Sequence, residues 1–396
     1  MRIDDVAIPA GFAWSSPFAK WQGSLSEVHS LDLAAAVTTR ALADRALDPA
    51  VLDGLVLGWT IPQPEAFYGA PTLAGRIGAP TLTGPMVSQA CATGVAALAA
   101  AAGVVAGGGG PQLVVTTDRT SNGPVLLHPT PSAMGGSPRA ESWVLDSFGR
   151  DPWTGKGMLA AGEIVAAQHG ITRDECDDLT VLRSEQYQRA LADDRAFHRR
   201  YQVPVEIPAK RGNGIPLEAD EGIRPALAEE IAKLAPVDPA GVLTFASQTH
   251  PADGCAGAVV TTVDRARELS DGAGLARLLG IGFARVGKCH MPEAPVPAAQ
   301  AALAAAGLAM RDVVAVTTHN PFAVNDLVFA RQTGVPLERM NAYGCSLIFG
   351  HPQAPTGLRS IAELIEELRL RGGGVGLFTG CAAGDTGAAI VLRVED

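Results

Sequence analysis

The chain has 396 residues, of which 47% are apolar and 18% charged, with 31 Lys and Arg against 41 Asp and Glu. This composition excludes a disordered chain, which has few apolar residues and many charges. The net charge of −10 provides no basic footprint, so we expect neither nucleic acid nor an anionic membrane as a partner. The length allows two or three domains, or one large duplicated fold.

The first residues and the cysteines bear on the compartment. Arg2 is followed at once by Asp4 and Asp5, without the apolar run of a secretory signal. The six cysteines are too sparse for a disulfide framework, and no pair has zinc-ribbon spacing. We therefore expect a reducing compartment, the cytoplasm, in which each thiol either fills the core or carries chemistry.

In chain order, the first half predicts a strand, a helix and a second strand. The strand covers Leu55–Trp59, and a loop rich in Gly, Pro and Thr follows it. The helix covers Ala92–Ala106 and ends at the glycines 107–110, which suit a helix C-terminus. The second strand covers Leu113–Thr117. This order is typical of parallel strands covered by helices, an α/β fold.

The middle of the chain, residues 119–245, has a different composition. Tryptophans and prolines interrupt it, and we expect an irregular loop or lid domain. Within it, Thr172 and Glu175 form a capping-box pattern that predicts a polar helix reaching about Arg189.

The second half repeats the order of the first. A strand is expected at Val313–Thr318, a helix at Thr356–Arg371 and a strand at Val375–Thr379. The repeat lies about 260 residues after the first block, which predicts two halves related by an internal twofold axis. The expected domains are an N-terminal half at 1–118, continued at about 246–270, the loop domain at 119–245, and a C-terminal half at 271–396.

Cys91 and His351 precede the two predicted helices at equivalent positions of the repeat. A helix N-terminus favours a thiolate, so we expect a lowered pKa for Cys91. The twofold axis would bring His351 opposite the thiol, giving a nucleophile and a base. The alternatives are a small buried cysteine and a histidine that serves only the loop end.

Cys381 and His319 each follow a predicted strand of the second half. The carboxyl ends of parallel strands are where sites of α/β proteins collect. Each residue alone is compatible with core packing or a turn. Four reactive groups at four equivalent points of the sheets, however, indicate one shared site.

Three motifs around these residues resemble those of the thiolase family, the CoA-dependent Claisen-condensing enzymes. They are the segments Ser88–Gly94, Gly350–Gly357 and Gly376–Cys381, with weaker matches at 121–124, 158–163 and 291–298. The similarity runs nearly end to end. It implies a duplicated five-layered αβαβα fold with an inserted loop domain.

The resemblance also implies a mechanism. Cys91, activated by His351, would attack an acyl-CoA or 3-oxoacyl-CoA and become acylated, and Cys381 would act as acid and base. His319 and His351 would serve the enolate oxygen, and backbone N–H groups of Cys91 and of the Cys381 loop the other oxyanion. The substrate-binding residues implied are Thr249, Met158 and Phe322. Neither a metal nor an organic cofactor is implied; the partners are acyl-CoA, CoA and a second subunit, in a homodimer or a dimer of dimers.

Three departures from the family pattern concern the substrate. His319–Phe322 reads His-Asn-Pro-Phe instead of Asn-Glu-Ala-Phe, which resembles the sterol-carrier-type branch. Ala383 replaces a usual glycine, and His250 and Pro251 follow Thr249 where small residues are usual. We therefore expect a bulkier or branched 3-oxoacyl group, or a partner subunit.

Two other functions remain open from the sequence. Cys91, His319 and His351 match the Cys-His-His order of a decarboxylating ketoacyl synthase, although that enzyme has no use for Cys381 or for a long loop domain. A non-catalytic thiolase-like subunit of a complex is the second alternative, and the presence of Cys91, His351 and Cys381 together argues against it.

Overall fold

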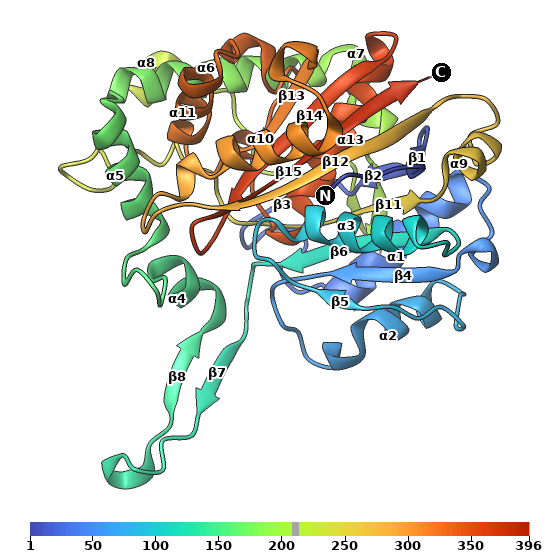
Figure 1. The fold of residues 1–396 in the computed structure, drawn as a ribbon. Coiled ribbons are helices and arrows are strands. Elements are labelled where there is room, and N and C mark those ends of the chain that lie inside the picture. Colours follow the sequence, from blue (N-terminus) through green and yellow to red (C-terminus); the bar gives the residue numbers. More distant parts are fainter. Residues whose placement is uncertain (208–213, 396) are drawn as a thin grey trace.

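The structure is a computed structural model that describes residues 1–207 and 214–395, and two large sheets form its body (Figure 1). The first sheet contains, in spatial order, β1 (Ala7–Pro9), β12 (Leu275–Arg285), β15 (Thr386–Glu395), β14 (Gly374–Ala382) and β13 (Ala315–His319). The second contains β2 (Ala13–Ser15), β11 (Ala252–Val260), β6 (Gln112–Arg119), β4 (Gly54–Gly58) and β5 (Met86–Val87), and β3 (Ala19–Lys20) also pairs with β11.

The two sheets confirm the predicted duplication. The four expected strands are β4, β6, β13 and β14, and the two expected helices are α3 (Thr93–Ala106) and α13 (Ala354–Leu370). β4 runs parallel to β6, and β13 runs parallel to β14. In each half an antiparallel partner follows, β11 beside β6 and β15 beside β14. One element crosses between the halves, because β1 extends the second-half sheet at the edge of β12.

Helices α3 and α13 lie between the two sheets. α13 packs against β13 and β14 on one side and against β2, β6 and β11 on the other. α1 (Ser30–Asp44) covers the outer face of the first-half sheet and α10 (Pro295–Ala306) that of the second, so the order of layers is αβαβα. α3 is apolar all round, and one apolar core joins it to both sheets, although Val104 and Ala106 near its C-terminal end are exposed.

The chain between β6 and β11 adds no strand to either large sheet in the part that the structure describes. Its hairpin, β7 (Val125–His128) and β8 (Arg139–Ser142), projects away from the body (Figure 1). Besides two 3₁₀ turns, the described part of this region contains α4 (Trp143–Gly149), α5 (Met158–His169), α6 (Arg173–Ala190), α7 (Ala192–Arg195), α8 (Ala228–Ile231) and the strand pair β9 (Val205–Ile207) and β10 (Ile215–Leu217). The predicted capping box of Thr172 and Glu175 does begin α6.

The other helices are α2 (Gly69–Arg76), α9 (Val263–Leu269), α11 (Ala323–Thr333) and α12 (Ser346–Phe349). α6 packs against α11 and α12, which attaches the inserted region to the second half. Among the described residues, no helix has the length and apolar character needed to cross a membrane.

Candidate active site

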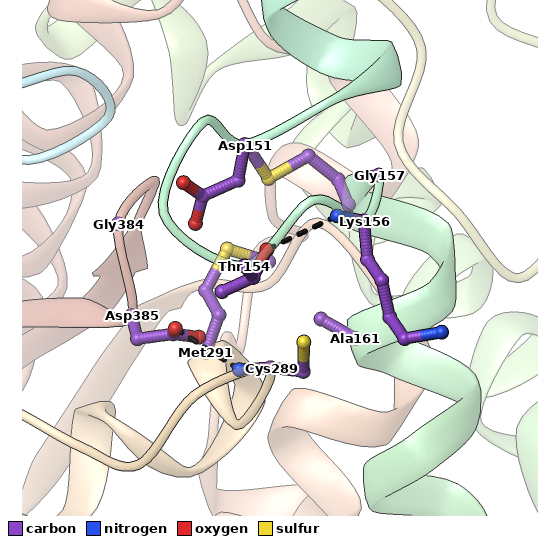
Figure 2. A pocket seen from close by; sticks show the side chains of 10 residues that line it. Asp151, Thr154, Lys156, Gly157, Ala161, Cys289, Met291, Gly384 and Asp385 are labelled. Carbon is purple, nitrogen blue, oxygen red and sulfur yellow. Dashed lines mark hydrogen bonds between the residues drawn. The ribbon is translucent and has the colours of Figure 1, made fainter.

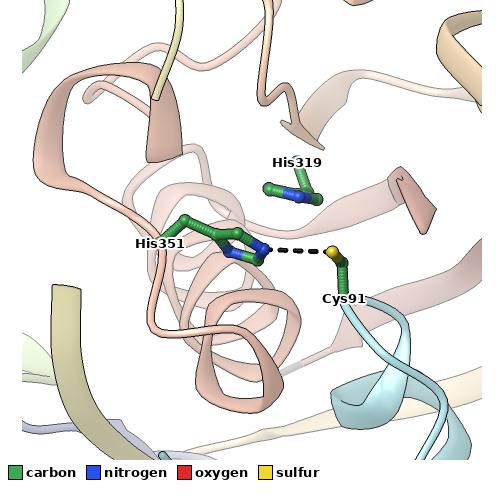
Figure 3. A group of neighbouring side chains, drawn as sticks. All are labelled: Cys91, His319 and His351. Carbon is green, nitrogen blue, oxygen red and sulfur yellow. Dashed lines mark hydrogen bonds between the residues drawn. The ribbon is translucent and has the colours of Figure 1, made fainter. Parts of the chain in front are cut away.

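The N-terminal ends of α3 and α13 meet between the sheets, and each presents a reactive side chain there. Cys91 lies two residues before α3, and His351 lies three residues before α13. The Cys91 thiol donates to His351 Nε2 over 3.1 Å (Figure 3). A Cβ on Gly94 would lie only 2.8 Å from the backbone nitrogen of Leu358, so the close helix crossing requires a glycine.

Both turns before these helices contain a non-glycine residue in the left-handed region. Ala90 has a φ of 46° and Gln353 a φ of 64°. Each such residue costs about 1–3 kcal/mol and persists where the surrounding structure enforces it, frequently at functional sites. Here the turns aim Cys91 and the Gln353 side chain at each other, with the sulfur 3.4 Å from Gln353 Oε1.

His351 is positioned as a neutral base. Its Nδ1 lies 2.7 Å from the Thr356 hydroxyl, on the first turn of α13, and this contact fixes the ring plane. Burial, together with the neighbouring His319, holds the pKa of His351 well below its usual value. The ring is therefore unprotonated at neutral pH, and its Nε2 can accept a proton from the thiol.

The expected lowering of the Cys91 pKa is wrong. Burial raises the pKa of the thiol to about 11, which outweighs the backbone N–H groups of Ala383 and of Cys91 itself that face the sulfur. The residue is half-buried as a whole, but protein surrounds its sulfur. The resting pair is thus a neutral thiol and a neutral imidazole, and the thiolate forms only on proton transfer to His351.

His319 lies beside this pair, at the end of β13. Its ring stacks on that of His351 with centroids 4.1 Å apart, and burial lowers the pKa of His319 to about 3 (Figure 3). Its Nδ1 lies 2.8 Å from the Ser346 hydroxyl, whereas its buried Nε2 has no hydrogen-bond partner in the described part of the chain. A buried polar atom without a partner at a reactive site points to a bond made with substrate.

Cys381 lies on β14, fully buried. Asn325 on α11 donates to its sulfur over 3.2 Å, and burial followed by the charge of Cys91 raises the pKa of Cys381 well above its usual value. The two sulfurs therefore share one electrostatic environment, and Cys381 carries a proton at neutral pH. Cys91, His319 and His351 therefore lie together, and Cys381 is near enough to Cys91 for the charge of that sulfur to affect it.

A cleft of about 1260 Å³ opens in front of Cys91 and His351. The predicted substrate residues Thr249, Met158 and Phe322 all line it, as do Ala383 and Trp143. The Thr249 hydroxyl donates to the Ser346 carbonyl, so only its oxygen lone pairs face a ligand. Cys381 and His319 are more deeply buried, and His319 lies next to the Cys91 and His351 side chains that line the cleft.

A second cavity adjoins the cleft and shares Met158 and Met291 with it as lining residues (Figure 2). At about 10 Å³ it has room for about one water molecule. The Asp385 carboxylate accepts the backbone N–H of Cys289 at its rim. An acyl chain therefore has to lie in the larger cleft.

Several residues that hold the site together were not predicted from the sequence. The four reactive side chains, or the turns that carry them, are contacted by Asn325, Ser346, Thr356, Gln353 and Asp118. Thr356 and Gln353 lie inside the Gly350–Gly357 motif, so the sequence could have indicated that they lie near His351. Asp118 and Asn325 come from other segments, and only the fold brings them near.

Cys91, His319 and His351 also place three ligand atoms within 4.8 Å of one another. Sulfur and imidazole are the ligands that Zn²⁺ prefers. The two rings are stacked, however, with only 28° between their planes. Their nitrogen lone pairs then run side by side instead of converging on a tetrahedral centre, and the arrangement suits proton transfer better than metal binding.

Comparisons with known proteins identify the family of the chain. The family model "Thiolase, N-terminal domain" matches residues 12–264, and "Thiolase, C-terminal domain" matches residues 273–394. The chain is 31% identical to a 3-ketoacyl-CoA thiolase of Erwinia tasmaniensis, over 96% of this chain and 95% of that protein. It is 28% identical to the human mitochondrial 3-ketoacyl-CoA thiolase, over 96% of both chains.

Solved structures give the same result. An acetyl-CoA acetyltransferase from Syntrophomonas wolfei has a TM-score of 0.90 at 28% identity, covering 99% of both chains. The human mitochondrial 3-ketoacyl-CoA thiolase, at 24% identity and a TM-score of 0.90 over 99% of both chains, shares the fold.

The duplicated five-layered fold and these matches place the chain in the thiolase family. It is an acyltransferase enzyme, and its reaction is thiolytic cleavage or condensation.

Proposed function

We propose that this protein is a CoA-dependent thiolase that cleaves or forms 3-oxoacyl-CoA esters through an acyl-Cys91 intermediate. One observation carries the proposal: a neutral His351 Nε2 lies 3.1 Å from the Cys91 thiol at the inner end of a large cleft. A thioester or ketone carbonyl needs a soft nucleophile activated by an adjacent base, and this pair provides both.

In the cleavage direction, His351 Nε2 takes the proton of Cys91 while the sulfur attacks C3 of the 3-oxoacyl-CoA. The N–H groups of Cys91 and Ala383 face the sulfur and lie where they can stabilise the developing oxyanion. The C2–C3 bond breaks, its electrons stay on C2, and the Cys381 thiol protonates that carbon. Cys91 is left as an acyl thioester, and acetyl-CoA leaves. Cys381 returns to the thiol by taking the proton of the incoming CoA thiol, whose sulfur attacks the acyl carbon. Cys91 then leaves as a thiolate and regains its proton from the protonated His351.

His319 would stabilise the enolate oxygen of the departing acetyl-CoA. This role needs a proton on Nε2, and therefore a hydrogen bond from the Ser346 hydroxyl to Nδ1. The 2.8 Å contact favours that arrangement over the longer alternative, in which Ser346 donates to Asn320 Oδ1 over 3.3 Å. Asn320 in turn donates to Asp326, which pairs with Arg183. The neutral amide of Asn320 therefore separates His319 from the buried carboxylate of Asp326.

The acyl group is proposed to be bulkier than acetyl, or branched. The cleft is large, and its wall includes the apolar side chains of Ile61, Val144, Phe148, Met158, Leu159 and Phe322. Each further buried CH₂ of an acyl chain contributes about 0.8 kcal/mol, so such a wall favours longer chains over acetyl.

A panel of 3-oxoacyl-CoA esters of increasing length and branching, each mixed with CoA, tests the function. We expect release of acetyl-CoA, and intact-protein mass spectrometry without CoA should show one acyl adduct that maps to Cys91. Cys91→Ala is the matched control and should show no adduct. An unmodified Cys91 with every acyl donor would instead favour a non-catalytic subunit.

A decarboxylating ketoacyl synthase is the second candidate, because Cys91, His319 and His351 form one cluster with stacked rings. Such an enzyme extends a malonyl thioester and releases CO₂, without a proton-transferring cysteine. Assay with malonyl-CoA in place of acetyl-CoA distinguishes the two, since a thiolase should give no condensation product from it.

We also propose a cytoplasmic homodimer. The six cysteines carry no disulfide, which suits a reducing compartment. β5 is the last strand of its sheet, and Met86 on it is exposed, as are Phe67 and Tyr68 of the first half. An open edge strand with exposed apolar side chains is suited to pairing with a second copy. Light scattering should give twice the mass of the chain, or four times for a dimer of dimers.

A further inference from the structure

Asp118 lies at the end of β6, on the first half of the molecule, and it is fully buried. Its carboxylate accepts four hydrogen bonds from neutral donors and has no basic partner among the described residues. Oδ1 accepts the backbone N–H groups of Thr60 and Ile61, and Oδ2 accepts the Thr60 hydroxyl and the backbone N–H of Ala354. Burying a carboxylate without a salt bridge costs free energy, so these four hydrogen bonds have to offset the loss of its contacts with water.

The four bonds connect three parts of the active site. Ala354 begins α13 and follows Gln353, so its N–H belongs to the turn that carries His351. Thr60 and Ile61 line the cleft. The Thr60 carbonyl accepts the indole N–H of Trp143 over 2.9 Å, and Trp143 begins α4 of the inserted region. Gln353 provides no side-chain cap to α13, so Asp118 fills that place from the other half of the molecule.

We propose that Asp118 is a positioning residue, whose carboxylate holds the His351 turn and the cleft wall in place relative to Cys91. Because a negative charge is preferred at a helix N-terminus, the carboxylate also stabilises the start of α13. The proposal rests on the proposed function for its effect on turnover, but not for its effect on the thiol.

The charge of Asp118 reaches the nucleophile directly. Burial is the main cause of the raised pKa of the Cys91 thiol, and the charge of Asp118 adds to it. Burial also raises the pKa of Asp118 itself to about 7. The other titratable groups that face the thiol are His319, His351 and Cys381. The two histidines are unprotonated and Cys381 is protonated at neutral pH, so Asp118 is the group whose charge changes there.

Asp118→Asn tests the proposal, with Asp253→Asn as the matched control. The amide introduced by Asp118→Asn can keep its oxygen toward Thr60 and Ile61, but its NH₂ then faces the Ala354 N–H, donor against donor. Asp253 is equally buried on the neighbouring strand β11 and accepts the Ser121 N–H, without contact to the site residues. Both variants remove one buried carboxylate.

Two readouts should move in opposite directions in Asp118→Asn. Alkylation of Cys91 by iodoacetamide at pH 8.5 should become about threefold faster, because loss of the neighbouring negative charge lowers the pKa of the thiol and increases its thiolate fraction. The difference should vanish near pH 6, where Asp118 of the unmodified protein is protonated. The kcat of thiolysis should fall about tenfold, the size expected when one hydrogen bond to a charged group is lost. The other five cysteines are buried, and Cys91→Ser gives the background labelling.

Alkylation that is unchanged in Asp118→Asn, or equally faster in Asp253→Asn, would overturn the proposal. A purely structural role predicts that both alkylation and thiolysis become slower in Asp118→Asn, and that result would overturn the proposal as well. If Asp118→Asn does not fold, the coupling between Asp118 and the thiol can be tested on the unmodified protein. Its alkylation rate should rise by clearly less than a hundredfold between pH 6 and 8, because Asp118 ionises in that interval, and a full hundredfold rise contradicts the coupling. Alkylation needs no substrate, so failure of the thiolase assay leaves this test intact.

Discussion

The starts of α3 and α13 are equivalent places in a duplicated fold, but they have different chemistry. The first carries Cys91, half-buried at the cleft, and the second carries His351, which is 5% exposed and held by Thr356 and the His319 ring. Three of the four reactive side chains come from the second half. In the proposed mechanism, the first half supplies the group that becomes covalently modified, while the second half supplies the groups that move protons.

Removing the nucleophile of the first half should have the largest effect. Cys91→Ala should lower kcat by at least about 10⁴-fold, because no other group can form the acyl intermediate. The expected measurement is loss of both acetyl-CoA release and the acyl adduct. Thermal unfolding should change little, since the substitution removes a small group beside a cleft. Residual activity above about 1% in a preparation free of unmodified protein would refute the assigned nucleophile.

Removing the acid of the second half should separate the two steps. Cys381→Ala should lower kcat of thiolysis by about 10³-fold, within the range for loss of a general acid or base. The acyl adduct on Cys91 should still form from a simple acyl-CoA, since that step needs only Cys91, His351 and the backbone N–H groups. Loss of the adduct as well would mean that Cys381 takes part in acylation.

The pH dependence of thiol reactivity sharpens the contrast between a neutral pair and an ion pair. Because burial raises the pKa of Cys91 to about 11, its thiolate fraction rises with pH throughout the range below that value. Iodoacetamide labelling should become about a hundredfold faster from pH 8 to pH 10. A rate that is already level at pH 8 would indicate a thiolate–imidazolium pair instead.

The smallest effect is expected from the support of the base. Thr356→Val removes the hydroxyl 2.7 Å from His351 Nδ1 but keeps the shape of the side chain. Loss of one buried hydrogen bond costs about 1 kcal/mol, so kcat/KM should fall about tenfold or less. Thr356→Ser, which keeps the hydroxyl, should restore most of the activity. Equal losses in Val and Ser variants would show that packing, and not the hydrogen bond, matters at this position.

The reactive residues could be predicted because each lies at a locally readable place. Cys91 and His351 precede apolar or amphipathic helices that end in glycines, and His319 and Cys381 lie at strand ends. The repeat of strand, helix and strand then implied that the four points converge. Asn325 and Asp118 could not be predicted, because each lies in an unrelated segment and reaches the site only through the packing of α11 and β6.

The amino-acid sequence by itself determined the strand–helix–strand order of both halves, the duplication and the residues capable of chemistry, since helix periods, glycine ends and motif spacing are local properties. Tertiary structure alone decided the protonation states. The helix N-terminus at Cys91 would favour a thiolate, but burial between two sheets disfavours the charge more strongly and raises the pKa of the thiol. Desolvation depends on everything that surrounds a sulfur, and segments hundreds of residues apart along the chain contribute to it.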